Sequence, residues 1–248
     1  MATGTPAPGI RARSARRCGT DPRAVCVTAP LWHPSPNFGP RRLGAKPDIV
    51  VIHHTAMASA EAALERLCDP QAEVSAHYLI AADGRAWQMV AEVARAWHAG
   101  AGSWGDVTDV NSRSVGIELD NPGDTPFPAP LMTTLEAILP GILRRWSIPP
   151  TRVIGHSDMA PDRKYDPGPH FDWERLERAG LAGKRGHDPG PDAPHPDTFR
   201  TVARHAGYTA DVDDDALLAA VRLRYRPFAT GPLCPQDYTP LGHAALWT

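Results

Sequence analysis

Cysteine is scarce in this sequence, and no cysteine lies close to another. Cys18, Cys26, Cys68 and Cys234 are far apart in a chain of 248 residues and form no CxxC pair. This spacing argues against a zinc knuckle built from cysteine pairs and against a disulfide framework. We interpret these residues as incidental thiols.

Long apolar segments and an excess of one charge are also missing. No run reaches the roughly 18 apolar residues that a membrane span needs, and no apolar stretch typical of a signal peptide follows the arginines near the start. We therefore expect no membrane span and a cytoplasmic location for the chain as written, or a periplasmic or envelope location if the start is misassigned. The net charge of -2 offers no whole-molecule attraction to nucleic acid. We also expect the protein to be a monomer.

Lysine is rare too, and one lysine stands in the most informative segment of the chain. Only Lys46, Lys164 and Lys184 occur among 26 basic residues. Lys164 belongs to residues 156–169, HSDMAPDRKYDPGP, which combine a histidine, several carboxylates and this lysine. The proline and glycine content predicts a loop, neither helix nor strand, with little apolar surface to bury. Because neutral imidazole and carboxylate are zinc ligands, we interpret the segment as a scaffold for polar groups and a metal.

Two further segments place a polar group at or near the end of an apolar strand. Residues 49–55, IVVIHHT, begin with an unbroken apolar run typical of a central strand and continue into His53 and His54. Residues 114–123, SVGIELDNPG, predict a short strand that carries Glu118. Side chains alternate along a strand, so His54 should point away from His53 and either pack or support the site from outside.

The remaining pattern predicts an α/β fold, with a mixed central β-sheet flanked by helices. Strands are expected at residues 48–53, 77–81, 86–90, 115–119 and 152–155, the second and third forming a hairpin around Asp83-Gly84. Helices are expected from Ser59 to about Leu67, along residues 131–146, and from Asp172 to Ala179. Pro140 should kink or restart the second of these helices.

The two ends of the chain differ from this central part. Residues 1–34 predict a disordered extension, residues 35–180 the main domain, and residues 181–197 a linker rich in Gly, Pro, Asp and His. Residues 198–248 predict a small C-terminal helical module, which either stands apart or covers an apolar face of the main domain. Residues 211–215 lack the Gly and distal Glu of a calcium loop, so we interpret them as a helix N-cap.

In this order, VIHHT, SVGIELDNPG and GHSDMAPDRKYDPGPHFDW resemble the zinc-dependent N-acetylmuramoyl-L-alanine amidases of the type-two amidase family, which are AmpD-like. The resemblance covers roughly residues 35–180 and extends to SAHYLI at 75–80 and AWHAG at 96–100. It implies one Zn²⁺ ion held by His53, His156 and Asp166. It also implies that Glu118 accepts a proton from water and that Lys164 faces the oxyanion. The C-terminal module is loosely similar to the peptidoglycan-binding module that often follows such domains.

These residue types suit the hydrolysis of an amide. The reaction needs an activated nucleophile and a group that stabilises the tetrahedral oxyanion. A catalytic zinc with three protein ligands leaves one position for water and lowers the pKa of that water towards about 7. Asp158, Asp162 and Asp172 compete with Asp166 as ligands, but capping and loop hydrogen bonds explain them.

Other residues of the family motifs have two interpretations. His77 and His98 either contact substrate or form internal hydrogen bonds, because the chemistry does not require them. Trp97, Trp104 and Asn121 are candidates for the lining of the substrate groove, whereas we expect Trp87 in the core. Of these residues, we assign His77, Trp97, His98 and Asn121 to substrate binding.

The expected function is that of a hydrolase acting on a linear amide, the bond between the lactyl group of N-acetylmuramic acid and L-alanine, in peptidoglycan or anhydro-muropeptides. The alternative is a non-catalytic peptidoglycan recognition domain, and a third is a zinc hydrolase acting on another amide. Relatives that bind without cutting tend to lose a metal ligand, whereas this chain keeps all three. The choice between intact murein and a soluble muropeptide stays open.

Overall fold

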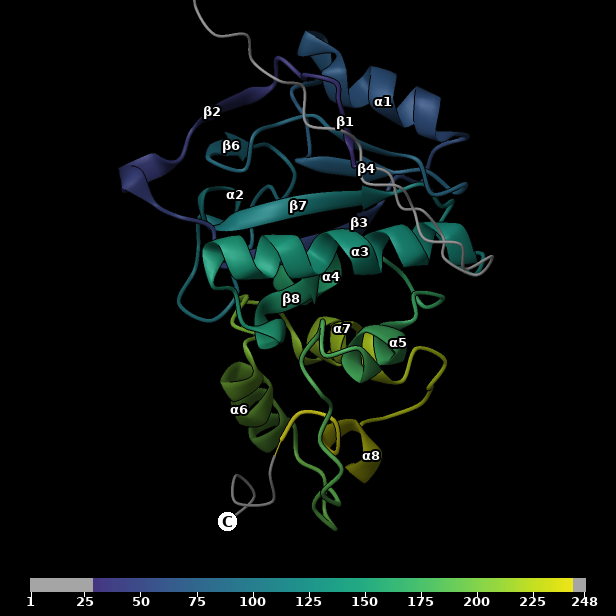
Figure 1. Ribbon diagram of the computed structural model, residues 1–248. Helices are drawn as coiled ribbons and strands as arrows, with labels where there is room; N and C mark the ends of the chain where they lie inside the picture. Colours follow the sequence, from purple (N-terminus) through teal and green to yellow (C-terminus); the bar gives the residue numbers. More distant parts are fainter. Residues whose placement is uncertain (1–28, 243–248) are drawn as a thin grey trace, which may run out of the picture.

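A six-stranded sheet forms the centre of the protein, as seen in a computed structural model that describes residues 29–242 (Figure 1). The strand order is β1-β5-β4-β7-β3-β8, and only the β4–β5 hairpin is antiparallel. The sheet is therefore mixed, as predicted. Its strands are β1 (Leu31–Trp32), β3 (Ile49–His54), β4 (Tyr78–Ile80), β5 (Ala86–Gln88), β7 (Ser114–Leu119) and β8 (Val153–Gly155). A separate antiparallel pair consists of β2 (Phe38–Pro40) and β6 (Ala94–Ala96).

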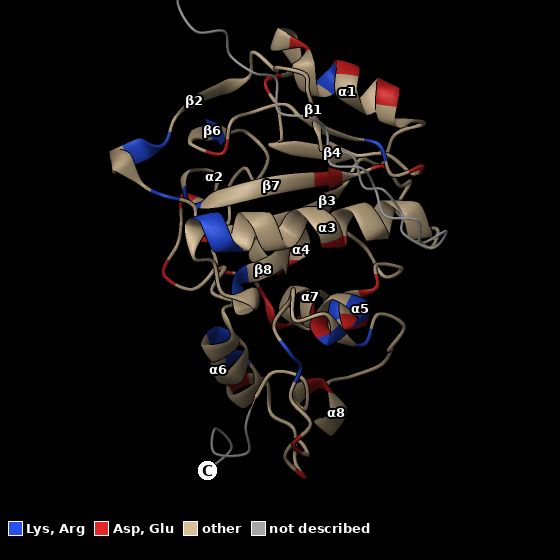
Figure 2. Ribbon diagram, in the orientation of Figure 1, with Lys and Arg blue, Asp and Glu red and all other residues tan. Residues whose placement is uncertain are grey.

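Helices cover both faces of this sheet. They are α1 (Ala60–Cys68), α2 (Val110–Arg113), α3 (Ala129–Trp146), α4 (His156–Met159), α5 (Trp173–Arg178), α6 (Pro196–Ala206), α7 (Asp214–Tyr225) and α8 (Pro235–Tyr238). The side chains of Ser59, Asp172 and Asp213 accept backbone N–H groups at the starts of α1, α5 and α7, so the predicted N-caps are confirmed. Acidic and basic residues are interspersed along α1 and α5 (Figure 2).

Alternation along β3 divides the core into two parts. Val50 and Ile52 point into the cluster beneath α3 and α5, whereas Ile49 and Val51 point into the cluster on the other face. His53 continues the second series, because side chains two residues apart share a face. The side chain of His53 therefore lies on the face of the sheet opposite α3, and that of the next residue, His54, lies on the α3 side.

The C-terminal helices complete the core on the face that His53 shares. Apolar side chains of α6 and α7, including Val202 and Val221, are buried in one cluster with Ile49 and Val51 of β3. Figure 1 shows α6, α7 and α8 gathered at the β8 end of the sheet. This packing corresponds to the alternative in which these helices cover an apolar face of the main domain.

Several expectations need correction. Residues 156–169 are not entirely loop, since α4 forms one helical turn that begins at His156. The segment also packs, because Met159 and Ala160 are buried in the core. Helix α3 runs through Pro140 as one element, without restarting. The predicted extension ends at residue 34, whereas β1 already pairs with β5 from Leu31 onward.

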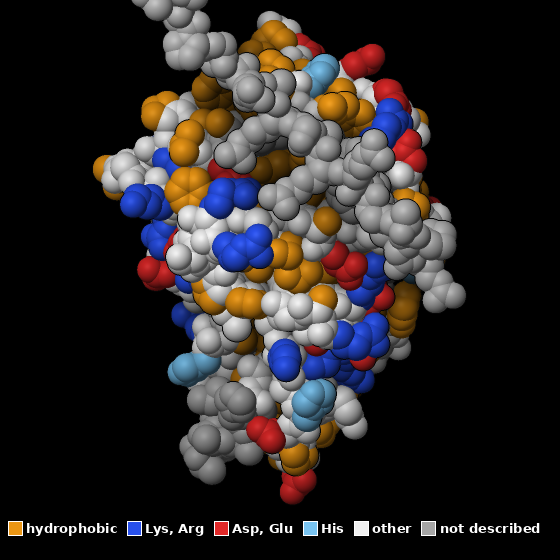
Figure 3. All heavy atoms as spheres, viewed as in Figure 1, with side chains coloured by type: hydrophobic (Ala, Val, Ile, Leu, Met, Phe, Trp, Pro, Cys, Tyr) orange, Lys and Arg blue, Asp and Glu red, His pale blue; other side chains and the backbone are white. Residues whose placement is uncertain are grey.

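The remaining features concern the chain ends and the surface. Residues 1–28, with Cys18 and Cys26, and residues 243–248 lie outside the described residues. The other two cysteines, Cys68 and Cys234, are free thiols. Within residues 29–242, no helix is both long and apolar enough to cross a membrane. On the face shown in Figure 3, basic, acidic and apolar side chains are intermingled.

Candidate metal centre and active site

The site forms where the carboxyl ends of three neighbouring strands meet. His53 is the last but one residue of β3, and Glu118 stands directly beside it on β7 in the parallel register. His156 opens α4 immediately after β8, on the other side of β3. Asp166 returns to the site from the loop after α4, where its backbone carbonyl accepts the Ser157 N–H. The sheet therefore brings together groups that are far apart in the sequence.

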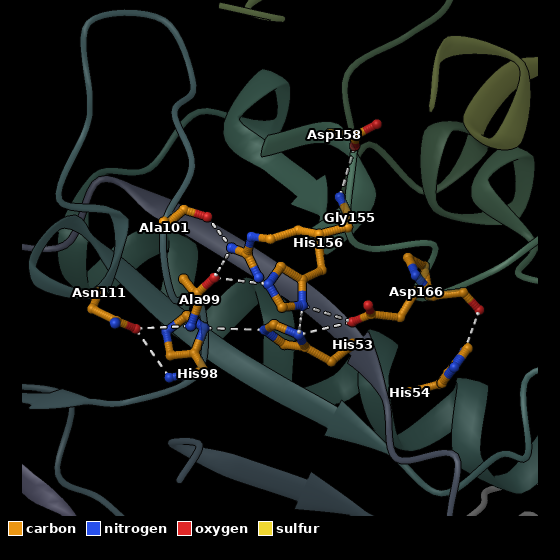
Figure 4. A network of polar contacts seen from close by, with 12 residues as sticks. His53, His54, His98, Ala99, Ala101, Asn111, Gly155, His156, Asp158 and Asp166 are labelled. Carbon is orange, nitrogen blue, oxygen red and sulfur yellow. Dashed lines mark hydrogen bonds and ion pairs between the residues drawn. The ribbon is translucent and has the colours of Figure 1, made fainter. Parts of the chain in front are cut away.

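His53, His156 and Asp166 converge on one point (Figure 4). His53 Nδ1 lies 3.0 Å from His156 Nδ1, and both nitrogens lie within 3.0 Å of Asp166 Oδ2. His156 Nε2 faces the Ala99 carbonyl at 2.9 Å, and a carbonyl can only accept, so Nε2 carries a proton and Nδ1 is the nitrogen available to a metal. The Nδ1 lone pair is then directed towards the other two atoms.

This donor set fits a metal cation. Lone pairs of imidazole and carboxylate that converge at about 3 Å repel one another unless a proton or a metal cation lies among them, and three such atoms around one point are the arrangement that a cation needs. Burial, together with the nearby His156, lowers the pKa of His53 to about 4, so its ring is neutral as a ligand must be. His53, His156 and Asp166 are all buried and form a group that could hold a metal ion.

Glu118 is placed as a proton acceptor beside this group. Its Oε2 atom is buried and has no hydrogen-bond partner among the described residues. Burial raises the pKa of Glu118 well above its ordinary value, and the negative charge of Asp166 adds to the effect. A carboxyl group with a raised pKa and a free oxygen in a cleft is typical of acid–base chemistry.

A cavity of about 360 Å³ opens onto the metal group. Its wall holds Glu118 and Lys164 together with Trp97 and His98. Among the lining residues that sequence reasoning did not assign to the site are Arg66 of α1, Arg163 and Tyr165. Arg163 and Tyr165 flank Lys164 in the loop motif, which was a signal for them, whereas nothing in the α1 pattern marked Arg66.

Two of the expected substrate contacts lie outside this cavity. His77 Nδ1 accepts the Gly116 N–H at 3.0 Å, so Nε2 carries the proton, which it donates to the Ala94 carbonyl at 3.2 Å. Burial lowers the pKa of His77 to about 3, and the ring is neutral. Asn121 supports a turn, since its Oδ1 accepts the Gly123 N–H at 2.7 Å. Both residues form internal hydrogen bonds, one of the two interpretations given for His77.

Other candidates are placed as follows. Trp104 is in the core, where its ring meets Tyr208 edge to face, so the expectation that it lines the groove was wrong. Trp87 is buried, as predicted. His54 Nδ1 lies 3.0 Å from the carbonyl oxygen of Pro167, the residue after Asp166, so it supports the metal loop from outside. Asp158 caps α4 by accepting the Gly155 N–H at 2.7 Å and is no rival to Asp166.

Comparison with known proteins identifies the family. The model of the N-acetylmuramoyl-L-alanine amidase family matches residues 43–169. N-acetylmuramoyl-L-alanine amidase AmiD of Escherichia coli K12 is 34% identical over 215 residues, which cover 72% of this chain and 75% of AmiD. The 1,6-anhydro-N-acetylmuramyl-L-alanine amidase AmpD of Enterobacter cloacae is 34% identical over 160 residues, which cover 58% of this chain and 86% of AmpD.

Solved structures agree with these sequences. The complex of E. coli AmiD with the substrate anhydro-N-acetylmuramic acid-L-Ala-D-gamma-Glu-L-Lys has a TM-score of 0.71 at 29% identity, covering 82% of this chain and 88% of AmiD. AmpDH3 of Pseudomonas aeruginosa, in complex with anhydromuramic pentapeptide, has a TM-score of 0.70 at 27% identity, covering 91% of this chain and 96% of AmpDH3. With a mixed sheet of the same architecture and a His-His-Asp group at its edge, this chain belongs to the N-acetylmuramoyl-L-alanine amidase family.

Proposed function

We propose that this protein is a zinc-dependent amidase that hydrolyses the bond between the lactyl group of N-acetylmuramic acid and L-alanine. The observation that carries the proposal is the convergence of His53, His156 and Asp166 in the cavity that also holds Glu118 and Lys164. The names of AmiD and AmpD and the muropeptides bound to AmiD and AmpDH3 support the choice of substrate.

His53, His156 and Asp166 would hold the metal, the two histidines through Nδ1. Two neutral nitrogens and one carboxylate oxygen are a ligand set that zinc accepts in catalytic sites. When bound, zinc lowers the pKa of a water molecule and polarises a carbonyl group. The ligand residues themselves remain neutral or acceptor-only, so they take no part in proton transfer.

Glu118 transfers protons in the reaction, and Lys164 stabilises negative charge. Glu118 removes a proton from the attacking water and, holding that proton, delivers it to the departing amino group of L-alanine. Its unpartnered Oε2 leaves an oxygen free for this exchange. Lys164 stands in the exposed part of the cavity wall, where its ammonium group stabilises the negative charge that develops on the carbonyl oxygen.

A non-catalytic recognition domain is the second candidate. It would need the cavity and its contacts but not the complete set of His53, His156, Asp166, Glu118 and Lys164 that lines it. The presence of all five side chains therefore favours the enzyme. A hydrolase acting on another amide shares this chemistry and differs only in the substrate it accepts.

One experiment separates these functions. Purified, zinc-loaded protein is incubated with insoluble murein and, separately, with a soluble anhydro-muropeptide, and the products are identified by mass spectrometry. We expect release of intact stem peptide with a free L-alanine amino terminus. Binding to either substrate without such a product would refute the amidase and support the recognition domain, while cleavage inside the stem peptide would identify a different amide. The relative rates on the two substrates decide between murein and muropeptide.

A further inference from the structure

A chain of hydrogen bonds leads from the metal ligand His53 into the protein interior, and Figure 4 shows its first link, from His53 to His98. His53 Nε2, the nitrogen that faces away from the metal group, lies 3.0 Å from Nδ1 of His98. His98 Nε2 lies 3.1 Å from the hydroxyl of Ser114, and that hydroxyl lies 2.5 Å from the Val110 carbonyl. In each of these hydrogen bonds, which group donates and which accepts depends on the next hydrogen bond in the chain.

The last link determines the direction of the whole chain. The carbonyl of Val110 can only accept, so the single proton of the Ser114 hydroxyl is donated to it. Ser114 must then accept from His98, which places the proton of His98 on Nε2. Because His53 directs Nδ1 at the proposed metal group, the proton of its neutral ring is on Nε2, 3.0 Å from His98 Nδ1. His98 Nδ1 therefore accepts the proton of His53 Nε2.

The ring of His98 can occupy this position only because residue 116 is a glycine. A Cβ atom at Gly116 would lie 2.5–2.6 Å from three atoms of the His98 ring, closer than real contacts allow. The backbone of the His98 segment is held separately by Asn111, whose Oδ1 accepts the N–H groups of His98 and Ala99 at 3.0 and 2.9 Å. Ala99 in turn accepts the Nε2 proton of the second ligand, His156. Two consecutive residues thus hold the outer nitrogens of both histidine ligands.

We propose that His98 is a positioning residue which, oriented by Ser114, fixes His53 in the tautomer that presents a bare Nδ1 to the metal. Asn111 extends the same role to His156 through the backbone of Ala99. The inference rests on the proposed metal site, and it assigns His98 to the support of a ligand rather than to contact with substrate. Partners that orient a ligating histidine typically contribute 10–100-fold to metal affinity.

Nuclear magnetic resonance of imidazole nitrogens tests the tautomers directly. In zinc-loaded protein labelled with ¹⁵N-histidine, we expect His98 to carry its proton on Nε2 and a scalar coupling to connect His53 Nε2 with His98 Nδ1. A proton on His98 Nδ1, or a doubly protonated ring, would overturn the inference. If the protein takes up no zinc, the proposed function fails by itself. The position of the His98 proton in the zinc-free protein then still decides this inference.

Two substitutions at one position test the effect on the metal. In His98→Leu both hydrogen bonds are lost, and we expect zinc affinity to fall by about 10–100-fold in competition with a chelator. In His98→Gln the amide can accept from His53 and donate to Ser114, so most of the affinity should return. His77→Gln is the matched control, since His77 is a buried neighbour that makes no hydrogen bond to a ligand. Wild-type zinc affinity in His98→Leu, or equal losses in the Leu and Gln variants, would refute the role.

Discussion

Arg224 should stabilise the whole protein, although it lies outside the cavity and far from the metal ligands in the sequence. Its guanidinium group on α7 donates to Asp158 Oδ2 at 2.7 Å. Asp158 also accepts from the Tyr208 hydroxyl at 2.7 Å and from the Gly155 N–H at 2.7 Å. The ion pair therefore connects the C-terminal helices to the helical turn that begins with His156.

The expected magnitude follows from the burial of both charges. The side chains of Arg224 and Asp158 are 3% and 1% exposed. Removing one partner of a buried pair leaves the other charge without compensation, which costs about 3–5 kcal/mol. For a chain of this length each kcal/mol lowers the melting temperature by about 2–4 °C, so Arg224→Met should lower it by about 6–20 °C. The neutral double variant with Asp158→Asn should be less destabilised than the sum of its parts, because neither charge remains buried alone.

Urea unfolding, followed by circular dichroism, measures the expected loss of about 3–5 kcal/mol in the free energy of unfolding. Arg178→Met is the control, because Arg178 pairs with Glu174 on the surface of α5, and both side chains are more than half exposed. We expect no resolvable change in that variant. If Arg224→Met unfolds at the same urea concentration as the wild type, the pair carries no net stability and the reasoning is wrong. A loss equal to that of Arg178→Met would lead to the same conclusion.

Five further variants test the remaining predictions. His156→Ala should lose most of its zinc, because a charged ion loses one of three ligands; elemental analysis that finds full zinc would exclude this ligand. Glu118→Gln should keep zinc and slow turnover by roughly 10²–10⁴-fold, because an amide cannot accept the proton of the water. Lys164→Ala should keep zinc and slow turnover on the order of 10²-fold, because one contact to the oxyanion is lost. A near-normal kcat in either variant would assign that catalytic role to another group. Truncation after residue 182 should unfold the protein or impair soluble and insoluble substrates equally, because it removes part of a shared core; impairment on murein alone would instead support a separate binding module. Burial alone would raise the pKa of Asp237, but hydrogen bonds from Arg222 and Cys234 have the larger combined effect, and the pKa of Asp237 is lowered to about 2. The ionised Asp237 carboxylate therefore stabilises the fold above about pH 4, and this contribution is lost as the pH falls towards 2. An Asp237→Asn variant whose acid unfolding curve matches that of the wild type would contradict this.

The truncation result bears on the domain boundaries expected from sequence. The composition of residues 181–197 predicts a linker, and the helical pattern beyond it predicts a module that could stand apart. The apolar side chains of α6 and α7 instead share a core with β3 and β8. We propose that these helices form part of the catalytic fold, and a role in peptidoglycan binding stays a prediction.

Local pattern was enough to predict most elements of the fold. The apolar run that ends in His53 predicted a central strand, and Asp83-Gly84 predicted the β4–β5 hairpin. Ser59, Asp172 and Asp213 marked helix starts, because a cap is formed by residues within one turn. Where prediction failed, as at α4, a buried contact with a distant segment outweighed the local preference: Met159 packs in the core beside α6 and α7.

The sequence by itself determined which chemical groups this protein brings to its site and in which order, because three segments each carry a recognisable motif. Only the tertiary structure decided which atoms of those groups meet. It showed that Asp158 turns to Arg224 while Asp166 joins the two histidines, and that His98 contacts His53. Strand and helix patterns depend on neighbours within a few residues, whereas these contacts join positions 10 to 113 residues apart. Such pairs depend on the path of the whole chain, and the periodicity of a single segment carries no information about that path.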